Sequence, residues 1–578
     1  MKVNYFLAQY LINLGARAVF GVSGANIEDI YDALLKIDQK TKDSNHPGIQ
    51  AILAKHEFSA GAMADAYSRI TGSIGIVLST SGGGAFNLIP ALAESFSSQV
   101  PVLALIGQAP TSTEGKGGFQ DSSGLAGSIN AETIFQGVSK YCKRITSPDE
   151  IPQALEEAVA LALLDPKGPV ILLIPKNIQQ SEIKNEVYST KQVVEQSQPP
   201  SDEIIKAISV IQESKKILII CGNGVCRTKS ENHIEILAKI LDADVALTAD
   251  GKSGFNNYSP QYVGIVGAMG HSSVLTQLEL ADTCIIVGTR LPDLHRVGLD
   301  SILIRKKIVY IHSAAPFTPL NTDFIILKGS TYSILKTLVE TLIKEKPKKL
   351  TTSLNQEVIH YSKMLFSSEL YTHSREFLKT LETMIEPDSN ILVDAGNIGA
   401  SVVHFLKIPK TSTFNIALGM GGMGYSFGAG IGAVLANKKK TYVISGDGSF
   451  FMHGSEVHTA VELNLPITFI IFNNNAHGMC VTREQIYLRA DYPLNRFKKS
   501  HLATGLAATY PSLLSFEVNH PNELEDCLYK NRNSTSTLFI SIELSPDEFP
   551  PFHPFLQQLD RLTKNSEVTP RILSNEVK

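Results

Sequence analysis

The chain has 578 residues, of which 43% are hydrophobic and 19% charged, and its 52 basic and 56 acidic residues leave a net charge of −4. This composition is typical of a folded globular protein and excludes a basic nucleic-acid binder, which needs positive charge to attract phosphates. Apolar runs such as Val170–Pro175 and Ile467–Phe472 have strand length, well short of the roughly 18 residues of a membrane-spanning helix. The length predicts three to four domains at about 150 residues each.

The first residues are expected to form a helix rather than a signal peptide. Apolar residues recur at helical spacing from Tyr5 to Leu14, and no small-residue cleavage site follows a basic start. The six cysteines are scattered and form no Cys-x-x-Cys pair, which favours reduced thiols over a zinc site or a disulfide framework. We therefore expect a cytoplasmic protein.

Two polar stretches, 177–203 and 344–356, are predicted to link domains. The first contains Pro199 and Pro200 among Gln and Ser residues, and the second places four lysines around Pro347. These boundaries divide the chain into an N-terminal domain (1–185), a central domain (186–350) and a C-terminal domain (351–578).

Each domain is predicted to alternate strands and helices. The strand candidates are short, apolar and rich in β-branched residues: Ala18–Val22, Gly75–Ser79, Val102–Ile106, Val170–Ile174, Ile217–Cys221, Cys284–Val287, Ile308–Ile311, Ile391–Val393, Thr441–Ile444, Ile467–Phe472 and Leu538–Glu543. Buried strands that alternate with helices predict an α/β protein with three doubly wound parallel sheets. Ligands bind such sheets at the carboxyl ends of their strands.

Polar residues follow two of these strands closely in sequence. Asp447 lies between Gly446 and Gly448 after one strand, and Asn474 follows the next strand. Neighbouring parallel strands would bring the two side chains together. A carboxylate, an amide oxygen and a free main-chain carbonyl suit Mg²⁺ that also contacts phosphates, and the glycines would let a diphosphate approach the main chain. The alternative for each piece alone is an ordinary turn.

A second glycine-rich segment offers a competing interpretation. Gly419–Gly424 has the form GxGxxG, follows the strand-like residues 414–418, and precedes both a helical run and Asp447. That pattern matches a dinucleotide fingerprint. We favour the magnesium interpretation, because a ribose-binding acid needs neither flanking glycines nor a following run of asparagines.

These motifs together resemble the thiamin-diphosphate superfamily of acetolactate synthase and pyruvate decarboxylase. GDGSF at 446–450 with NNN at 473–475 is similar to its cofactor motif, His56–Tyr67 to its segment with the activating glutamate, and Thr80–Asn87 to its glycine segment. Gly107–Thr111, Phe119-Gln120 and Gly168–Lys176 extend the resemblance over the first domain. It covers nearly the whole chain, in the order pyrimidine-binding, central and diphosphate-binding domain.

The resemblance implies a role for individual residues. Glu57 would hydrogen-bond the aminopyrimidine ring, Gly421 would hold that ring with its carbonyl, and Met423 would bend the cofactor. The metal ligands would be Asp447, Asn474 and the carbonyl of Ala476. The complete cofactor-binding set is Glu57, Ser81, Asn87, Gly421, Met423, Gly446, Asp447, Gly448, Ser449, Asn474 and Met479.

The substrate side departs from acetolactate synthases. Ala25-Asn26 resembles benzaldehyde lyase, and Asn26 would either bind a substrate carbonyl or cap a helix. Arg483 stands where synthases place a tryptophan, and it would either bind an acidic substrate or face solvent. His56 and His477 would be proton shuttles or structural hydrogen-bonding groups. The expected catalytic residues are Glu57, Gln120, Phe119, Asn26 and His477.

The resemblance implies an Mg²⁺- and thiamin-diphosphate-dependent enzyme that decarboxylates a 2-oxo acid, pyruvate by default, and joins the product to a second carbonyl compound. The alternatives are a benzaldehyde-lyase-like enzyme acting on 2-hydroxyketones and a non-catalytic module that binds the cofactor or a nucleotide. A homodimer or homotetramer is expected, with active sites at the subunit interface. FAD in the central domain is doubtful, because the stretch after Arg290 lacks an acid and an arginine of the synthase pattern.

Overall fold

The computed structural model describes residues 1–42, 48–184, 199–317, 324–345 and 372–564. The described residues fall into two compact units. The first unit comprises 1–195, 417–439 and 452–467, and the second comprises 196–416, 440–451 and 468–578. The first unit is therefore discontinuous in sequence, because two segments from the last third of the chain belong to it.

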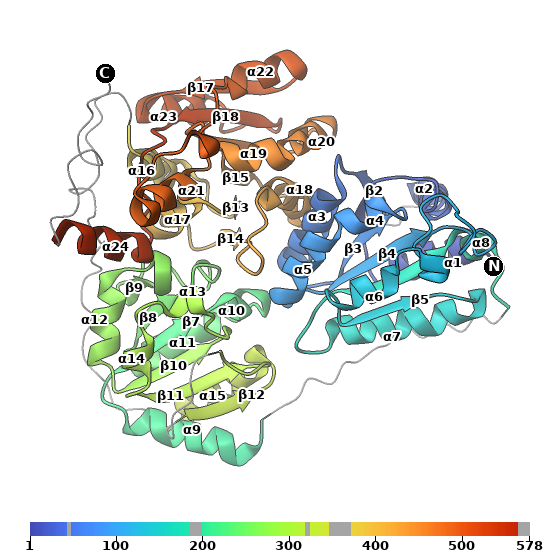
Figure 1. Cartoon of the computed structure of the whole chain (residues 1–578). Coiled ribbons are helices and arrows are strands. Elements are labelled where there is room, and N and C mark those ends of the chain that lie inside the picture. Colours follow the sequence, from blue (N-terminus) through green and yellow to red (C-terminus); the bar gives the residue numbers. More distant parts are fainter. Residues whose placement is uncertain (43–47, 185–198, 318–323, 346–371, 565–578) are drawn as a thin grey trace. The chain divides into compact units, whose positions relative to one another are not determined.

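Three six-stranded sheets of parallel strands form the framework of the described chain (Figure 1). The first contains β1 (Ala18–Gly21), β2 (Gln50–Leu53), β3 (Gly75–Ser79), β4 (Val102–Gln108), β5 (Tyr141–Arg144) and β6 (Val170–Pro175). The second contains β7 (Ile217–Cys221), β8 (Asp244–Leu247), β9 (Tyr262–Ile265), β10 (Thr283–Val287), β11 (Lys307–His312) and β12 (Phe324–Lys328). The third contains β13 (Asn390–Val393), β14 (Thr413–Ile416), β15 (Thr441–Gly446), β16 (Ile467–Asn473), β17 (Leu514–Val518) and β18 (Leu538–Glu543).

The first and third sheets share one strand order. They run β2-β1-β3-β4-β6-β5 and β14-β13-β15-β16-β18-β17, whereas the second runs β12-β11-β10-β7-β8-β9. Three parallel sheets flanked by helices confirm the predicted α/β fold class. All eleven strand candidates lie within observed strands to within a residue at their ends.

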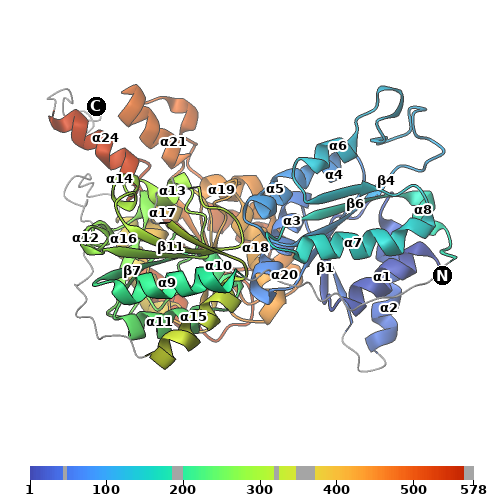
Figure 2. The ribbon, with the colours of Figure 1, turned by 90° about the horizontal axis from the view of Figure 1, so that it is seen from below.

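Helices flank the sheets on both sides, as the parallel arrangement requires. In the first sheet, apolar side chains of α1 (Val3–Asn13), α2 (Glu28–Lys42) and α7 (Ile151–Leu163) form one core, and α3 (Glu57–Thr71) covers the other face (Figure 2). In the second sheet, α12 (Ser272–Leu280) and α14 (Asp300–Leu303) pack on one side. The predicted N-terminal helix is confirmed as α1.

The remaining helices complete the element order. The first unit also contains α4 (Gly83–Asn87), α5 (Ile89–Ser97), α6 (Ala131–Gln136), α8 (Lys176–Gln180), α18 (Tyr425–Asn437) and α20 (Val457–Glu462). The second contains α9 (Ser201–Glu213), α10 (Asn223–Arg227), α11 (Glu231–Leu241), α13 (Asp293–Arg296), α15 (Thr331–Glu345), α16 (Ser374–Met384), α17 (Asn397–Phe405), α21 (Gly478–Arg483), α22 (Leu502–Thr509), α23 (Pro521–Lys530) and α24 (His553–Lys564). Helix α19 (Asp447–His453) begins in the second unit and ends in the first.

The predicted linkers need correction at their ends. The first was expected to start at Asn177, but α8 occupies Lys176–Gln180, and α9 begins at Ser201, directly after Pro200. Proline before the first helical residue is compatible with a helix start, so the two prolines mark a helix boundary rather than a loop. In the second linker α15 continues to Glu345, and the rest lies outside the described residues.

Helix α18 packs along α3 in the first unit at very short range. A Cβ on Gly432 would lie 2.1 Å from the carbonyl oxygen of Met63, and a Cβ on Gly428 would lie 2.4 Å from that of Ser59. The two helices therefore touch through their main chains, which only glycine permits at these two positions.

No helix in the described part of the chain is both long and apolar enough to cross a membrane.

Candidate active site

The expected metal ligands come together at the carboxyl edge of the third sheet. β15 and β16 are neighbours, as their spacing predicts, and Asp447 and Asn474 directly follow them. The main-chain N–H of Ala476 donates to Asp447 Oδ2 over 3.2 Å and to Asn474 Oδ1 over 3.1 Å. Two side-chain oxygens thus converge on one amide. Asp447 opens helix α19, so the glycine-flanked acid is a helix start rather than the ordinary turn of the alternative interpretation.

Each asparagine of the run 473–475 has a different environment. Asn473 donates to the side chain of Glu543 on β18 and to the carbonyl of Ser500. Asn475 has a positive φ of 50° and its side-chain oxygen accepts from the N–H of Ser500 over 2.8 Å. Of the three, Asn474 is the one whose side-chain oxygen shares the Ala476 amide with Asp447. The outer two asparagines therefore hold the loop, and the oxygen of the middle one meets only the Ala476 amide in the contacts described above.

Burial changes the protonation of Asp447, whose side chain is only 1% exposed. Loss of solvent raises the pKa of this carboxyl to about 7, although main-chain N–H groups, including those of Asn474 and Ala476, act in the opposite direction. A bound cation would stabilise the ionised form of this buried carboxylate, because it would compensate the negative charge.

The donor set at this edge fits magnesium. It offers the Asp447 carboxylate, the Asn474 amide oxygen and the carbonyl of Ala476, all hard oxygen donors. Among the described residues no group of three or more His, Cys, Asp or Glu side chains is arranged to hold a metal. A magnesium ion here would depend on phosphate oxygens or water for its remaining ligands, which is its usual preference.

Gly446, Gly448 and Ser449, which were expected to bind the cofactor, differ in their surroundings. A Cβ on Gly446 would lie 3.8 Å from the Ile398 side chain and 3.9 Å from the carbonyl oxygen of Phe472, so the protein packs against this glycine at ordinary contact distance. Ser449 is buried, and its hydroxyl donates to Asp394 Oδ1 over 3.0 Å. Gly448 lies between them, buried in the first turn of α19. Ser449 is thus committed to the protein rather than open to the cofactor through its side chain.

In the first unit, Glu57 is the first residue of α3 and is 8% exposed. Its Oε2 accepts from the Nδ2 of Asn87 over 2.9 Å. A Cβ on Gly84 would lie 2.8 Å from Oε1, so the glycine segment closes directly over the carboxylate. Burial and the nearby Glu57 charge both raise the pKa of Tyr31. Asn87, expected to bind the cofactor, instead orients Glu57 in this structure.

Two expected catalytic residues, Asn26 and Gln120, meet at the hydroxyl of Ser81, a residue that was expected to bind the cofactor. Ser81 Oγ accepts from the Asn26 side-chain amide over 2.6 Å and donates to Gln120 Oε1 over 3.1 Å. Gln120 has a positive φ of 59°. Phe119, next in sequence, is 83% exposed and takes no part in this contact group. The structure therefore joins Asn26, Ser81 and Gln120, and leaves Phe119 to project outward.

His56 has a structural role at the start of α3. Its Nδ1 accepts from the N–H of Phe58 and so caps the helix. Glu456, fully buried, accepts the N–H groups of Lys55 and His56 on a single oxygen. The residues immediately before Glu57 are thereby fixed through their main chain, which favours the structural interpretation of His56.

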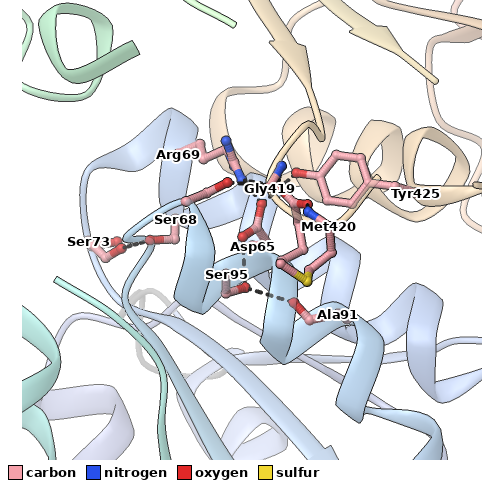
Figure 3. A network of polar contacts seen from close by, with 11 residues as sticks. Asp65, Ser68, Arg69, Ser73, Ala91, Ser95, Gly419, Met420 and Tyr425 are labelled. Carbon is pink, nitrogen blue, oxygen red and sulfur yellow. Dashed lines mark hydrogen bonds and ion pairs between the residues drawn. The ribbon is translucent and has the colours of Figure 1, made fainter. Parts of the chain in front are cut away.

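The loop that carries Gly421 and Met423 is tied to two helices of the same unit. Glu94 on α5 accepts the N–H groups of Gly419 and Met420, over 3.2 and 2.6 Å. Beyond the loop, the Tyr425 hydroxyl donates to Asp65 Oδ1 over 2.5 Å. Figure 3 shows Gly419, Met420 and Tyr425 gathered around Asp65 and Arg69 of α3. Gly421 is exposed with a positive φ of 66°, and Met423 is half-buried.

The residues after Asn474 pack against their own unit. The ring of His477 meets that of Phe497 edge-on at 4.7 Å, and Met479 lies against the apolar cluster that includes Phe549 and Phe555. Arg483 is exposed, with its guanidinium 3.2 Å from the sulfur of Cys480. Of its two interpretations, the structure favours a solvent-facing arginine.

The glycine turns of the second sheet have a packing reason of their own. A Cβ on Gly222 would lie 2.7 Å from the carbonyl oxygen of Gly288, and one on Gly224 would lie 2.7 Å from its Cα. The turns after β7 and β10 thus pass each other main chain against main chain. These glycines are explained without a bound nucleotide, so they do not argue for FAD.

Sequence reasoning did not find Asp65, Arg69, Glu94 or Glu456. Each side chain is buried and charged, yet none was assigned a role, although Asp65 lies within the His56–Tyr67 segment. Their partners are up to 401 residues away in sequence, so only the folded chain reveals them. The residues expected to hold the pyrimidine side lie in the first unit, and the metal ligands lie in the second.

Comparison with known proteins adds three family matches. Residues 1–126 match the thiamine pyrophosphate enzyme N-terminal TPP binding domain, 204–336 the central domain and 394–542 the C-terminal TPP binding domain. The chain is 28% identical to a probable acetolactate synthase large subunit of Methanocaldococcus jannaschii, over 96% of this chain and 94% of that protein. It is 26% identical to the acetolactate synthase isozyme 3 large subunit of Escherichia coli, over 90% of each.

Proposed function

Because the chain belongs to the thiamine pyrophosphate enzymes and is an acetolactate synthase-like, C–C bond-forming member, we propose that it decarboxylates a 2-oxo acid and joins the product to a second carbonyl compound. Pyruvate is the proposed donor. The observation that carries the proposal is the convergence of Asp447 and Asn474 on the amide of Ala476.

Thiamin diphosphate, the same molecule as thiamine pyrophosphate, would supply a thiazolium carbon that attacks the carbonyl of the 2-oxo acid and accepts its electrons on loss of CO₂. Asp447, Asn474 and Ala476 would hold Mg²⁺ against its diphosphate. The site fits a bound cation, because the carboxylate of Asp447 is buried and a cation would compensate its charge.

Glu57 would act on the aminopyrimidine. A carboxylate that hydrogen-bonds the ring nitrogen favours the tautomer that removes the thiazolium proton. The Asn87 amide fixes one oxygen of Glu57, and its 8% exposure keeps most water away. Gly421 and Met423 would support the same ring, so we propose the pyrimidine side in residues of the first unit.

The Asn26–Ser81–Gln120 group would bind the substrate. Because Ser81 both accepts and donates, the two amide side chains are held in fixed orientations. A buried asparagine amide in this position also favours a second candidate function, cleavage or ligation of 2-hydroxyketones without decarboxylation. Phe119, His477 and Met479 would complete the substrate side, although their present contacts are with solvent or their own unit.

We further propose a homodimer as the smallest active form, with a homotetramer as the larger alternative. The matched relatives are described as large subunits, which supports assembly. The three domains are proposed at 1–185, 186–350 and 351–578, each with one sheet. FAD has no role in the proposed reaction.

The decisive experiment incubates the purified protein with thiamin diphosphate, Mg²⁺ and pyruvate, and follows CO₂ and acetolactate separately. Formation of both supports the synthase reaction. CO₂ without acetolactate would replace it with decarboxylation or a different acceptor. Cleavage of 2-hydroxyketones without pyruvate consumption would favour the second candidate. Asp447→Asn, measured beside the wild type, shows whether the activity depends on the proposed site.

A further inference from the structure

The loop between β14 and α18 is anchored at both ends by carboxylates of the first unit. At its start Glu94 receives two consecutive main-chain N–H groups, from Gly419 and Met420. At its end Tyr425 gives its hydroxyl proton to Asp65. A bidentate arrangement of this kind fixes both the position and the orientation of a peptide unit.

Arg69 compensates the negative charges of Asp65 and Glu94, which are buried. Its guanidinium donates to Asp65 over 2.6 Å and approaches Glu94 at 3.4 Å, and all three side chains are at most 3% exposed. Burial alone would lower the pKa of Arg69, but the two carboxylates and Tyr425 hold it above its ordinary value. Arg69 thus pairs with both Asp65 and Glu94. The N–H groups of the loop and the Tyr425 hydroxyl donate the further hydrogen bonds that stabilise the two carboxylates.

The arrangement leaves Glu94 little freedom. Ser98, one turn further along the chain, donates to Glu94 Oε1 over 2.7 Å, so this oxygen receives Ser98, Arg69 and Gly419. A Cβ on Gly419 would come within 3.0 Å of the same oxygen, so the loop lies directly on it. The anchored amides precede Gly421 by one and two residues.

We propose that Glu94, oriented by Arg69, is a positioning residue that sets the main chain of Gly421 and the side chain of Met423 before the cofactor binds. This inference rests on the proposed function, in which Gly421 and Met423 support the aminopyrimidine ring of the cofactor. Glu94 would act through the loop, because its hydrogen bonds described above go to Gly419, Met420, Arg69 and Ser98. Because Glu94 already holds the loop in one conformation, cofactor binding would not have to supply the free energy for ordering it.

The first test uses the cofactor-free wild-type protein and hydrogen exchange. The amides of Gly419 and Met420 are expected to exchange on the order of a hundredfold more slowly than in an unstructured chain, because they are bonded to a buried carboxylate. Exchange at the unstructured rate in the folded protein would overturn the proposal. This measurement needs no variant and no substrate.

The second test compares Glu94→Gln with a matched control. Glutamine keeps the size but offers only one acceptor, so one of the two amides loses its partner. We expect faster exchange in 417–424 and about tenfold weaker binding of thiamin diphosphate with Mg²⁺. The control is Asp282→Asn, because Asp282 also accepts two consecutive amides, of Lys215 and Lys216, but in the second sheet's part of the chain. The control should bind normally.

A milder variant keeps the test decisive if Glu94→Gln does not fold. Tyr425→Phe removes only the hydroxyl at the other end of the loop, and Asp65 keeps its bonds to Arg69 and Ser95. It should weaken cofactor binding by less than Glu94→Gln would, with the same exchange signature. Unchanged binding and exchange in the folded variants would overturn the proposal.

The outcomes separate this inference from the proposed function. A wild type that binds thiamin diphosphate but consumes no pyruvate removes the proposed reaction and leaves the role of Glu94 intact. A variant with normal loop exchange and normal cofactor affinity removes the role of Glu94, whatever the reaction. The circular dichroism of the bound aminopyrimidine should also shift in Glu94→Gln, which a purely structural role would not cause.

Discussion

The expected metal ligands of the second unit, the metal half, and the expected pyrimidine-side residues of the first unit, the pyrimidine half, are built in opposite ways. The metal half comes from one continuous stretch, in which Asp447 and Asn474 follow neighbouring strands of the third sheet. The pyrimidine half joins the start of α3 to a loop more than three hundred residues later, held by Glu94 and Asp65. Local spacing therefore determines the first half, whereas long-range packing and buried charges determine the second. Variants of the two halves should fail in different ways.

The largest effect is expected from Glu57→Gln. Removing the carboxylate should lower the rate of pyruvate consumption by at least about a hundredfold, because an amide cannot drive the aminopyrimidine tautomer. Binding of thiamin diphosphate should stay nearly unchanged, and calorimetric titration checks it. Glu28→Gln, an exposed acid in the first turn of α2, is the matched control. A Glu57 variant as active as this control would refute the assignment.

Gly432→Ala tests the long-range packing of the pyrimidine half. A methyl group would meet the Met63 carbonyl at 2.1 Å, so α18 and α3 must separate. We expect a loss of about 1–3 kcal/mol in the free energy of unfolding, measured with urea. Gly505→Ala in α22 meets nothing within 4 Å and should be neutral or stabilising by up to about 1 kcal/mol. Equal stability of the two variants would contradict the close contact.

Asp447→Asn tests the metal half, with a different signature. The variant should weaken the joint binding of Mg²⁺ and thiamin diphosphate by about tenfold or more, because a charged ligand is lost. The cofactor-free protein should be no less stable, since the buried carboxylate has a pKa raised to about 7 and its ionised form is costly there. A stability loss without a change in affinity would show that Asp447 is only structural.

Lys252 lies outside both halves, and its effect is on the pH dependence of stability rather than on cofactor binding. Burial lowers the pKa of Lys252 to about 7. The nearby charge of Glu382 acts to raise this pKa, and that of Lys407 acts to lower it. His271 and His404 also lie close and, with pKa values lowered by burial, stay neutral. The unfolded chain keeps the lysine proton up to about 10.5, so it binds more protons between pH 7 and 10, and wild-type stability rises with pH.

The matching variant is Lys252→Met. Relative to it, the wild type should gain on the order of 3 kcal/mol in unfolding free energy from pH 7 to pH 10. Urea unfolding at several pH values measures this difference. A constant difference over the range would mean that Lys252 is already solvated or paired.

The sequence predicts the interior strands well and the edge strands poorly. β5 reads Tyr-Cys-Lys-Arg and is half-buried throughout, and β17 is exposed at three of its five residues. An edge strand has one neighbour and meets solvent, so it lacks the continuous apolar run by which an interior strand is recognised. β2, β9 and β12 lie at edges as well and were also missed.

The candidate site was predictable where a motif carries its own chemistry. The Asp447–Asn474 pair followed from spacing and strand geometry, and the structure places both on one amide. Glu57 and Met423 depended on family resemblance. Glu94 and Arg69 were out of reach, because a helical acid and a helical arginine are usually solvated, and nothing local distinguishes a buried pair.

The main-chain contact between α3 and α18 also has a consequence for how the protein is made. α3 ends at Thr71 and α18 begins at Tyr425, so a ribosome completes the first helix roughly 350 residues before its partner exists. At about 10 residues per second, the face of α3 with the Ser59 and Met63 carbonyls waits on the order of half a minute without its partner. The first unit cannot finish folding during synthesis until nearly the whole chain has emerged.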